Sequence, residues 1–359
     1  MNDPLHGLKL GNVPVAREVG RLNGVTGILL EATGYAFETG QRTRIETTSG
    51  QWLEARVVGF RNNVSYLMPF RKPSGLVAGA RVVADTDEHR LQIGPAWRGR
   101  IIDGLGSPID GLGPLLGEQP LDLHPPRVNP MKKQPISGVL DVGVRAINGM
   151  LTLGRGQRVG LFAGSGVGKS VLLGMITRQT EADVVVVGLI GERGREVREF
   201  IEHSLGPEGL RNAVVVVAPA YESPLMRLMA AELCHAIAAH YRDGGSNVLL
   251  LVDSLTRYAM AQREVALALG EPPATRGCWI VGLVARAQRL LAADHIEHLH
   301  ARTGAVEDGS EHRLACAIRA LFRASGIGVG EIAGHRVEAH GLRAHGRARD
   351  LGDAFEAHD

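Results

Sequence analysis

The sequence predicts an α/β protein in which helices cover both sides of a parallel sheet and a small β-barrel precedes that sheet. Three observations carry this prediction. Residues 24–92 read as short, closely spaced strands, four apolar runs recur between residues 158 and 253, and helical stretches separate those runs. A chain of 359 residues is also long enough for two or three domains.

The first region is rich in β-branched residues and is punctuated by Gly, Asn and Ser turns. Its expected strands lie within GVTGILLEATG, TRIETTSGQWLEARVVGF, VSYLMPF and GARVVAD. The TTSGQ stretch at 47–51 reads as the tip of a hairpin. Short strands at this spacing favour a small barrel or sandwich, and we assign residues 1–92 to an N-terminal β-barrel domain.

Residues 93–136 are expected to form a linker or an extended crossing between domains. Prolines crowd the second half of this segment, because proline occupies positions 114, 120, 125, 126, 130 and 135. Proline has no backbone N–H and restricts the residue before it, so a regular helix or strand is not expected there.

Residues 137–277 are assigned to the α/β core. The expected strands are RVGLF (158–162), DVVVVGLI (183–190), AVVVVA (213–218) and NVLLLVD (247–253). Short, continuous apolar runs of this kind are typical of parallel strands that are buried on both faces.

Two helices of the core have clear start and stop signals. Ser223 is an expected N-cap with Pro224 at the first helical position, and the helix should run to about Tyr241. A second helix should run from about Ser254 to Leu269, where Gly270 follows as a stop signal. Strands that alternate with helices in this order predict a nucleotide-binding type of α/β architecture.

Composition argues against several partners and locations. The formal net charge of +2 indicates neither a nucleic-acid footprint nor a polybasic membrane anchor. The longest apolar runs, such as VVVVGLI at 184–190, are far shorter than the roughly 20 residues that span a bilayer. The opening MNDPLHGLKL has no signal-peptide pattern. Three distant cysteines without a CxxC pair fit reduced thiols in the cytoplasm.

The stretch AGSGVGKS at 163–170 follows an expected strand and precedes an expected helix, which is the context that a phosphate-binding loop requires. Its glycines let successive backbone N–H groups point inward around phosphate oxygens, and the helix N-terminus favours an anion. Ala163 stands where the strict pattern has Gly. The expected nucleotide-binding residues are Gly164, Ser165, Gly166, Val167, Gly168, Lys169, Ser170 and Val171.

Charged residues at the ends of two other strands add to this site. Asp253 ends an apolar strand, where it could contact Mg²⁺, although it could also cap the helix that follows. Glu192 follows another strand and could deprotonate the attacking water. Arg193, beside it, could contact the γ-phosphate. The alternative is that this charged run is only a solvated loop. Arg257 lies four residues after Asp253, one helical turn further on, and should face the same site.

Five segments together resemble a known family. RGQRVGLFAGSGVGKSVLLGMITR, GLIGERGREVREFIE, VVVVAPAYESPLMRLMAAELCHAIAAHYRDGG, NVLLLVDSLTRYAMAQREVALALGEPPATRG and GRIIDGLGSPIDGLGPL closely resemble the type III secretion ATPases of injectisomes and flagella. This family is related to the catalytic subunits of the rotary F- and V-type ATPases. The resemblance extends over about residues 17–277, and AGSGVGKS together with GERGREV separates this branch from the rotary subunits.

The resemblance implies a β-barrel, a RecA-like P-loop ATPase core and a helical C-terminal domain, assembled as a homohexamer. It implies ATP and Mg²⁺ as cofactors, with Lys169 and Ser170 as the phosphate-loop pair and Glu192 as the general base. It further implies Arg193 as a γ-phosphate contact, Asp253 as the acid near Mg²⁺ and, more loosely, Arg257 as a support. AGSGVGKS slightly favours the injectisome branch.

The same resemblance implies a protein export function. The family forms a cytoplasmic ring at the inner membrane, where it hydrolyses ATP to release chaperones from export substrates and to unfold those substrates. Its partners are stalk and regulator proteins and chaperone–effector complexes. No nucleic acid is implied, and the membrane is contacted only peripherally through the export apparatus.

Residues 278–359 depart from the family pattern. From Gly277 onward the chain has no Pro, Lys, Asn or Tyr but holds 8 of its 14 histidines. We therefore expect an atypical Arg/His/Ala-rich tail that lacks the last strands of the sheet, the helical domain and the arginine that reaches a neighbouring subunit. A shifted reading frame or a foreign fusion would explain the break, and hydrolysis should be impaired.

Two further functions remain open. The chain could be a catalytically silent, truncated nucleotide-binding relative; an RNA-translocating hexamer is disfavoured by the near-neutral charge. The tail also contains His295, His298 and His300 close to Asp294 and Glu297. His295 and His298 would share a helical face, but a solvated segment with weak helical tendency is the preferred interpretation over a metal site.

Overall fold

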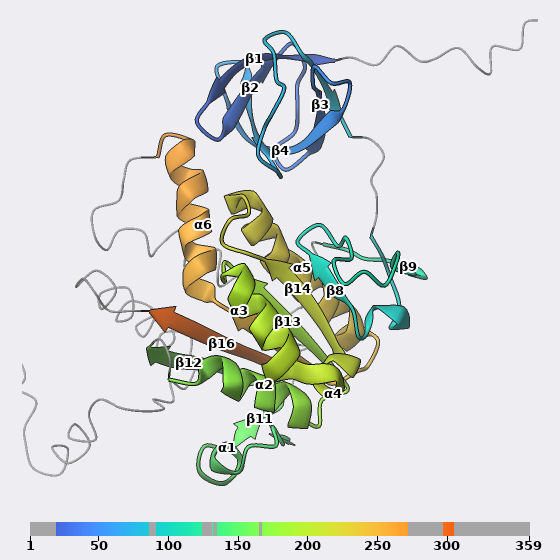
Figure 1. Cartoon of the computed structure of the whole chain (residues 1–359), viewed down its shortest axis with the longest axis vertical. Helices are drawn as coiled ribbons and strands as arrows, with labels where there is room; N and C mark the ends of the chain where they lie inside the picture. Colours follow the sequence, from blue (N-terminus) through green and yellow to red (C-terminus); the bar gives the residue numbers. More distant parts are fainter. Residues whose placement is uncertain are drawn as a thin grey trace, which may run out of the picture.

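A computed structural model describes residues 19–85, 91–123, 131, 135–164, 167–271 and 297–304. Figure 1 shows a closed barrel at one end of the molecule and a larger unit of sheet and helices at the other. The parallel sheet and the closed barrel confirm the predicted fold class.

The barrel is formed by six antiparallel strands in the order β1-β2-β5-β4-β3-β6. Alternation places apolar side chains such as Leu30, Ile45 and Leu67 inside the barrel, where none is exposed. The predicted hairpin at 47–51 joins β3 to β4, whose ends Glu46 and Trp52 pair. The strands are β1 (Gly20–Thr26), β2 (Leu29–Thr33), β3 (Arg42–Glu46), β4 (Trp52–Arg61), β5 (Val64–Pro69) and β6 (Arg81–Ala84).

The core is a six-stranded parallel sheet in the order β12-β16-β15-β13-β14-β8. All side chains of β13, β14 and β15 are buried, as expected for strands covered on both faces. The strands are β8 (Ile101–Asp103), β12 (Arg158–Gly164), β13 (Val184–Ile190), β14 (Ala213–Ala218), β15 (Val248–Asp253) and β16 (Glu297–Gly304). The four strands predicted for the core are therefore confirmed.

Helices pack on both faces of the sheet (Figure 1). Alternate residues of β13 project to opposite faces, so that Val186 belongs to the buried cluster that includes α5 and α6, while Val187 belongs to the cluster that includes α2 and α3. The elements of one face are α2 (Lys169–Gln179), α3 (Gly194–Glu199), the π-helical segment η4 (Phe200–Leu205) and α4 (Gly206–Arg211). Those of the other are α5 (Pro224–Asp243) and α6 (Leu255–Ala268).

The caps of the two long helices match their sequence signals. The Ser223 hydroxyl accepts a hydrogen bond from the Met226 N–H at the start of α5, and Pro224 occupies the first helical position. The Ser254 hydroxyl likewise accepts from the Arg257 N–H at the start of α6. These caps fix where each helix begins relative to the strand before it.

The segment predicted as a crossing contributes a strand to the core. β8 pairs with β14 at the edge of the sheet, and the chain then folds back over the outer side of β8. There the Ile109 N–H donates to the Ile101 carbonyl, and the Asp103 N–H to the Ser107 carbonyl. Short elements lie within this segment and between it and β12: β7 (Gln92–Ile93), η2 (Pro95–Trp97), β9 (Gln119–Pro120), β10 (Val139–Leu140), α1 (Arg145–Met150) and β11 (Leu153–Gly154).

One stretch of the predicted tail lies inside the sheet. β16 is inserted between β12 and β15, with His300 in register with Gly160 on one side and Val252 on the other. The expectations that this stretch is weakly helical and that the tail supplies no strand are therefore wrong for 297–304. His295 and Asp294 lie outside the described residues, as does the rest of the tail. The predicted domain limits stay predictions.

The barrel and the core pack against each other. Met68 and Phe70 at the base of the barrel belong to the same buried cluster as α5. Arg56 of β4 forms an ion pair with Glu232 of α5, with 3.4 Å between nitrogen and oxygen. Among the described helices, none is both long and apolar enough to cross a membrane.

Candidate nucleotide-binding site

The predicted phosphate loop joins β12 to α2. β12 ends at Gly164, and α2 begins at Lys169 directly after Gly168, whose φ of 93° is in the left-handed region that favours glycine. The first N–H groups of α2 have no partner within the helix, which makes its N-terminus suited to an anion. Val167 and Val171 are each 56% exposed, while Ser165 and Gly166 lie outside the described residues.

A buried ion pair lies immediately beside this loop. The Lys169 Nζ atom is 2.6 Å from the Asp253 Oδ1 atom, and the two side chains are 3% and 5% exposed. Asp253 is the last residue of β15, so the carboxyl end of that strand faces the start of α2. Burial raises the pKa of Asp253, and the contact with Lys169 opposes this shift. The structure thus brings together the two residues expected to hold phosphate and metal.

Glu192 follows the carboxyl end of β13 and is also buried. Among the residues that the structure describes, none forms a hydrogen bond with its Oε1 atom. Burial raises the pKa of Glu192 to about 7; the negative charge of Asp253 and a hydrogen bond with Glu196 act in the same direction, and Lys169 and Arg257 oppose them. A carboxyl group in this state can take up or release a proton near neutral pH.

The other predicted residues occupy more open positions. Ser170 is exposed at the start of α2, next to Lys169. Arg193 has a side chain that is 72% exposed and contacts Glu196 at 3.6 Å, so most of it lies in solvent. Arg257 packs against Gly191, where a Cβ atom would come within 2.7 Å of the Arg257 Cβ. The absence of a side chain at Gly191 therefore allows Arg257 to lie beside Glu192 and Asp253.

Glu196 was not among the predicted site residues. It lies four residues after Glu192 in the same charged run, GERGREV, and this proximity in the sequence could have indicated it. The direct contact between Lys169 and Asp253 was not predicted either, because the motifs assign each residue to a ligand.

The side chains present suit a nucleotide with a divalent cation. The hydroxyl of Ser170 and the carboxylate of Asp253 are hard oxygen ligands of the kind that Mg²⁺ prefers. Lys169 and the N-terminus of α2 provide positive charge for phosphate groups. The unpartnered oxygen of Glu192 lacks a donor that a water molecule could supply. Among the described residues, no group of His, Cys, Asp and Glu forms a separate metal site.

Comparison with known proteins agrees with this site. Residues 143–291 match the family model described as "ATP synthase alpha/beta family, nucleotide-binding domain". The flagellum-specific ATP synthase of Pseudomonas aeruginosa is 56% identical over 261 residues, which cover 72% of this chain and 58% of that protein. The protein of the same name in Salmonella typhimurium is 53% identical over 280 residues, covering 75% and 61%.

Solved structures show the same likeness. The assembled ATPase EscN of the enteropathogenic E. coli type III secretion system superposes with a TM-score of 0.72 at 34% identity. The match covers 84% of this chain and 74% of EscN. EscN in complex with its central stalk EscO gives a TM-score of 0.73, also at 34% identity, with coverage of 84% and 73%.

The fold, the phosphate loop and the paired acids define a P-loop nucleotide-binding protein of the ATP synthase α/β type. Within that class, the chain belongs to the family of type III secretion ATPases, which includes the flagellar export ATPases. The chain spans about 58–61% of the length of the two curated relatives described above. These two flagellar proteins are 56% and 53% identical to the chain and EscN is 34% identical, while the slight injectisome preference drawn from AGSGVGKS stays a prediction.

Proposed function

We propose that this chain is an ATPase of a flagellar-type protein export apparatus, in which ATP hydrolysis releases chaperones from export substrates and unfolds those substrates. The observation that carries the catalytic part is Glu192: a buried carboxyl group with one unpartnered oxygen, next to the Lys169–Asp253 pair. Family membership supports the part that concerns export.

Lys169 and the backbone N–H groups at the start of α2 bind the β- and γ-phosphates of ATP in this proposal. The phosphate-loop positions Gly164, Ser165, Gly166, Val167 and Gly168 enclose the phosphates, with Val171 one turn into the helix. Ser170 and Asp253 would hold Mg²⁺, which supplies charge neutralisation between the phosphates when it is bound. ATP would compete with Asp253 for Lys169, since one ammonium group would serve both the carboxylate and the phosphates.

Glu192 is the general base of the proposal. A group with a pKa of about 7 is ionised in a large fraction of molecules at neutral pH and can accept a proton from water. Arg257 stabilises the ionised forms of Glu192 and Asp253 through its charge. Arg193, which points outward in this structure, would contact the γ-phosphate after rotation of its side chain.

The relatives support an inference about assembly and location. EscN is described as assembled and in complex with a central stalk. By analogy, we infer that this chain forms a homo-oligomer, as the hexamer of the family, and contacts a stalk protein, regulator proteins and chaperone–effector complexes. Its place would be the cytoplasmic face of the inner membrane.

Turnover by this chain should nevertheless be slow. Residues 278–359 carry no arginine in the family's pattern, and an arginine supplied by a neighbouring subunit is worth about 10³–10⁵ in rate. Hydrolysis per chain should then be independent of protein concentration. A rate that rises cooperatively as the chain assembles would contradict this part of the proposal.

Single-turnover hydrolysis of radiolabelled ATP, measured beside equilibrium ATP binding, tests the catalytic proposal. The wild-type chain should release phosphate only with Mg²⁺, and Glu192→Gln should bind ATP but hydrolyse it about 10²–10⁴ times more slowly. Glu181 is an exposed carboxylate at the other end of the sheet, so Glu181→Gln is the matched control and should leave the hydrolysis rate unchanged. Binding without any hydrolysis by the wild type would favour the silent relative instead.

A further inference from the structure

The loop between β14 and α5, residues 219–222, is held at both ends by contacts that reach distant parts of the chain. At its start, the Ala220 N–H donates to the Glu192 carbonyl at 2.9 Å. β14, the strand before the loop, is also bonded to the backbone next to Glu192, because the Gly191 N–H donates to the Ala218 carbonyl at 2.7 Å. The loop therefore fixes the backbone of Glu192 from the side of β14.

At its other end, the same loop reaches the β-barrel through Ser223. The Ser223 hydroxyl donates to the Phe70 carbonyl at 2.9 Å and accepts from the Met226 N–H at 3.2 Å. Phe70 is itself fixed to the barrel, since its N–H donates to the Glu54 carbonyl of β4 and Arg42 lies over its ring. One hydroxyl thus joins the helix cap to the base of the barrel.

Ser223 lies three positions after Ala220, and Glu222 closes a tight turn over residues 219–222 by donating its N–H to the Pro219 carbonyl at 3.0 Å. Hydrogen-bonded, rigid segments of this kind are physical connections through which two sites can be coupled. Movement of the barrel relative to α5 would therefore pull on the backbone that carries Glu192.

We propose that Ser223 is a positioning residue that couples the β-barrel to Glu192 through the 219–222 turn. Loss of its bond to Phe70 should release Glu192 from the barrel without removing any group that touches nucleotide. The proposal rests on the catalytic role proposed above for Glu192, and it extends that role to a residue and a domain outside the site.

The alternative is that Ser223 only caps α5. Ser223→Asp separates the two roles, because a carboxylate accepts the Met226 N–H as a good N-cap but has no proton to donate to the Phe70 carbonyl. Ser223→Thr keeps both roles. Arg56→Gln weakens a second contact between the barrel and α5, the ion pair with Glu232, which does not lead to the 219–222 turn.

The experiment compares these three variants with the wild type by single-turnover hydrolysis and by hydrogen–deuterium exchange. Ser223→Asp should lower the hydrolysis rate at least about fivefold with little change in ATP affinity. MgATP should slow amide exchange of residues 64–70 in the wild type, in Ser223→Thr and in Arg56→Gln, but not in Ser223→Asp, because coupling between two sites is reciprocal.

Hydrogen–deuterium exchange measured without nucleotide tests the coupling through Ser223 even if the chain neither binds nor hydrolyses ATP. Ser223→Asp should then speed exchange of residues 190–194 and 219–222 relative to wild type, Ser223→Thr should not, and Arg56→Gln should not. The proposal is overturned if Ser223→Asp behaves as wild type there, or if Arg56→Gln reproduces its effect. Failure of ATP binding in every variant would instead count against the proposed function.

Discussion

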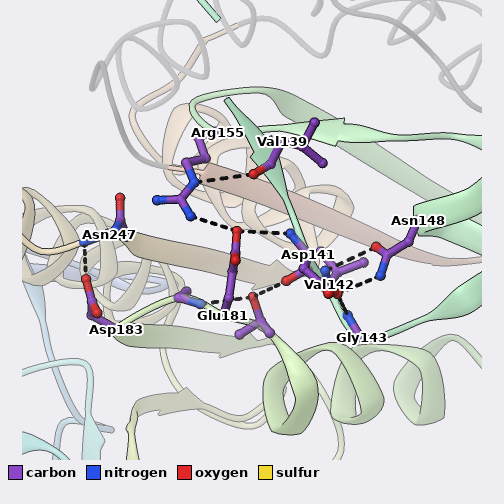
Figure 2. Close-up of polar contacts among 11 residues, drawn as sticks. Val139, Asp141, Val142, Gly143, Asn148, Arg155, Glu181, Asp183 and Asn247 are labelled. Carbon is purple, nitrogen blue, oxygen red and sulfur yellow. Dashed lines mark hydrogen bonds and ion pairs between the residues drawn. The ribbon is translucent and has the colours of Figure 1, made fainter. Parts of the chain in front are cut away.

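The two ends of the core sheet both carry clusters of charged side chains, but the clusters differ in burial and in how completely they are paired. At the carboxyl end, Lys169, Asp253 and Glu192 are buried, and one oxygen of Glu192 has no partner within the described part of the chain. At the amino end, an exposed cluster formed by Asp141, Asn148, Arg155 and Glu181 is bonded throughout (Figure 2).

The contacts of the amino-end cluster hold the chain before β12 against the end of α2. The Asp141 carboxylate accepts from the Gly143 N–H and from the Asn148 side chain, both at 2.6 Å. Glu181 accepts from Arg155 at 2.8 Å and from the Asp141 N–H at 3.2 Å. The bond from the Gly143 N–H is the main reason why the pKa of Asp141 lies below its usual value.

The difference teaches how to tell a cluster that supports the fold from one that supports chemistry. At the amino end, the Asp141 and Glu181 carboxylates accept hydrogen bonds from donors that the fold supplies, so neither needs a ligand for that purpose. At the carboxyl end, burial raises the pKa of both acids, and Lys169 alone cannot satisfy them. That imbalance is what a cation or a substrate water would correct.

The largest effect should come from removing one partner of the buried pair. Lys169→Met leaves Asp253 buried without its counter-ion, which should lower the free energy of unfolding by about 3–5 kcal/mol. Adding Asp253→Asn should restore much of that loss. Urea unfolding measures both, and Arg155→Met at the amino end is the control, with an expected loss of at most about 1 kcal/mol. Equal losses of unfolding free energy in Lys169→Met and Arg155→Met would contradict the difference between the two clusters.

A smaller effect is expected on nucleotide affinity. Asp253→Asn removes the anion that competes with phosphate for Lys169, so ATP without Mg²⁺ should bind about tenfold more tightly, or ~1.4 kcal/mol. The gain from adding Mg²⁺ should shrink at the same time, because a cation ligand is lost. Isothermal titration with and without Mg²⁺ tests this, with Asp183→Asn at the amino end as control. Unchanged Mg²⁺ dependence in Asp253→Asn would contradict the assigned role.

The two ends should also respond to pH in opposite directions. The folded-state pKa of Glu192 is raised from 4.5 to about 7, so the folded chain holds a proton that the unfolded chain has lost. Its contribution to stability therefore falls as pH rises from about 4.5 to 7. Glu192→Gln should remove that fall, as seen in unfolding midpoints across this range. A slope that persists in the variant would point to another group.

The smallest effect is expected at Asp141. Its pKa is lowered in the folded chain, so the stability that it contributes is present above its usual pKa and is lost as pH falls below that value. Asp141→Asn should lower the melting temperature slightly at pH 7, lose its difference from wild type in acid, and leave ATP binding unchanged. A defect in ATP binding would show that the amino-end cluster is not merely structural.

Much of the fold was predictable because its signals are local. Continuous apolar runs identified β13, β14 and β15, and the Ser-Pro pair identified the start of α5. Contacts between residues far apart in the sequence gave no such signal. The strand β8 was read as part of a linker because its pairing with β14 depends on residues more than a hundred positions away.

The same distinction applies to the site. Glycine spacing and strand ends predicted that Lys169, Asp253 and Glu192 would lie together. The outward direction of Arg193 and the packing of Arg257 on Gly191 depend on where α3 and α6 start relative to the strands before them, which local patterns do not encode. The insertion of β16 beside β12 likewise ran against the composition of its segment.

The position of β8 has a practical consequence for anyone who wishes to isolate the ATP-binding half. A fragment begun at residue 137, after the proline-rich stretch, would omit β8 and the residues 107–109 that fold over it. β14 would then present a bare row of backbone donors and acceptors along an apolar strand, a template on which fragments could pair and precipitate. A fragment begun near residue 91 would include β8, which pairs with β14, and residues 107–109, which fold over β8.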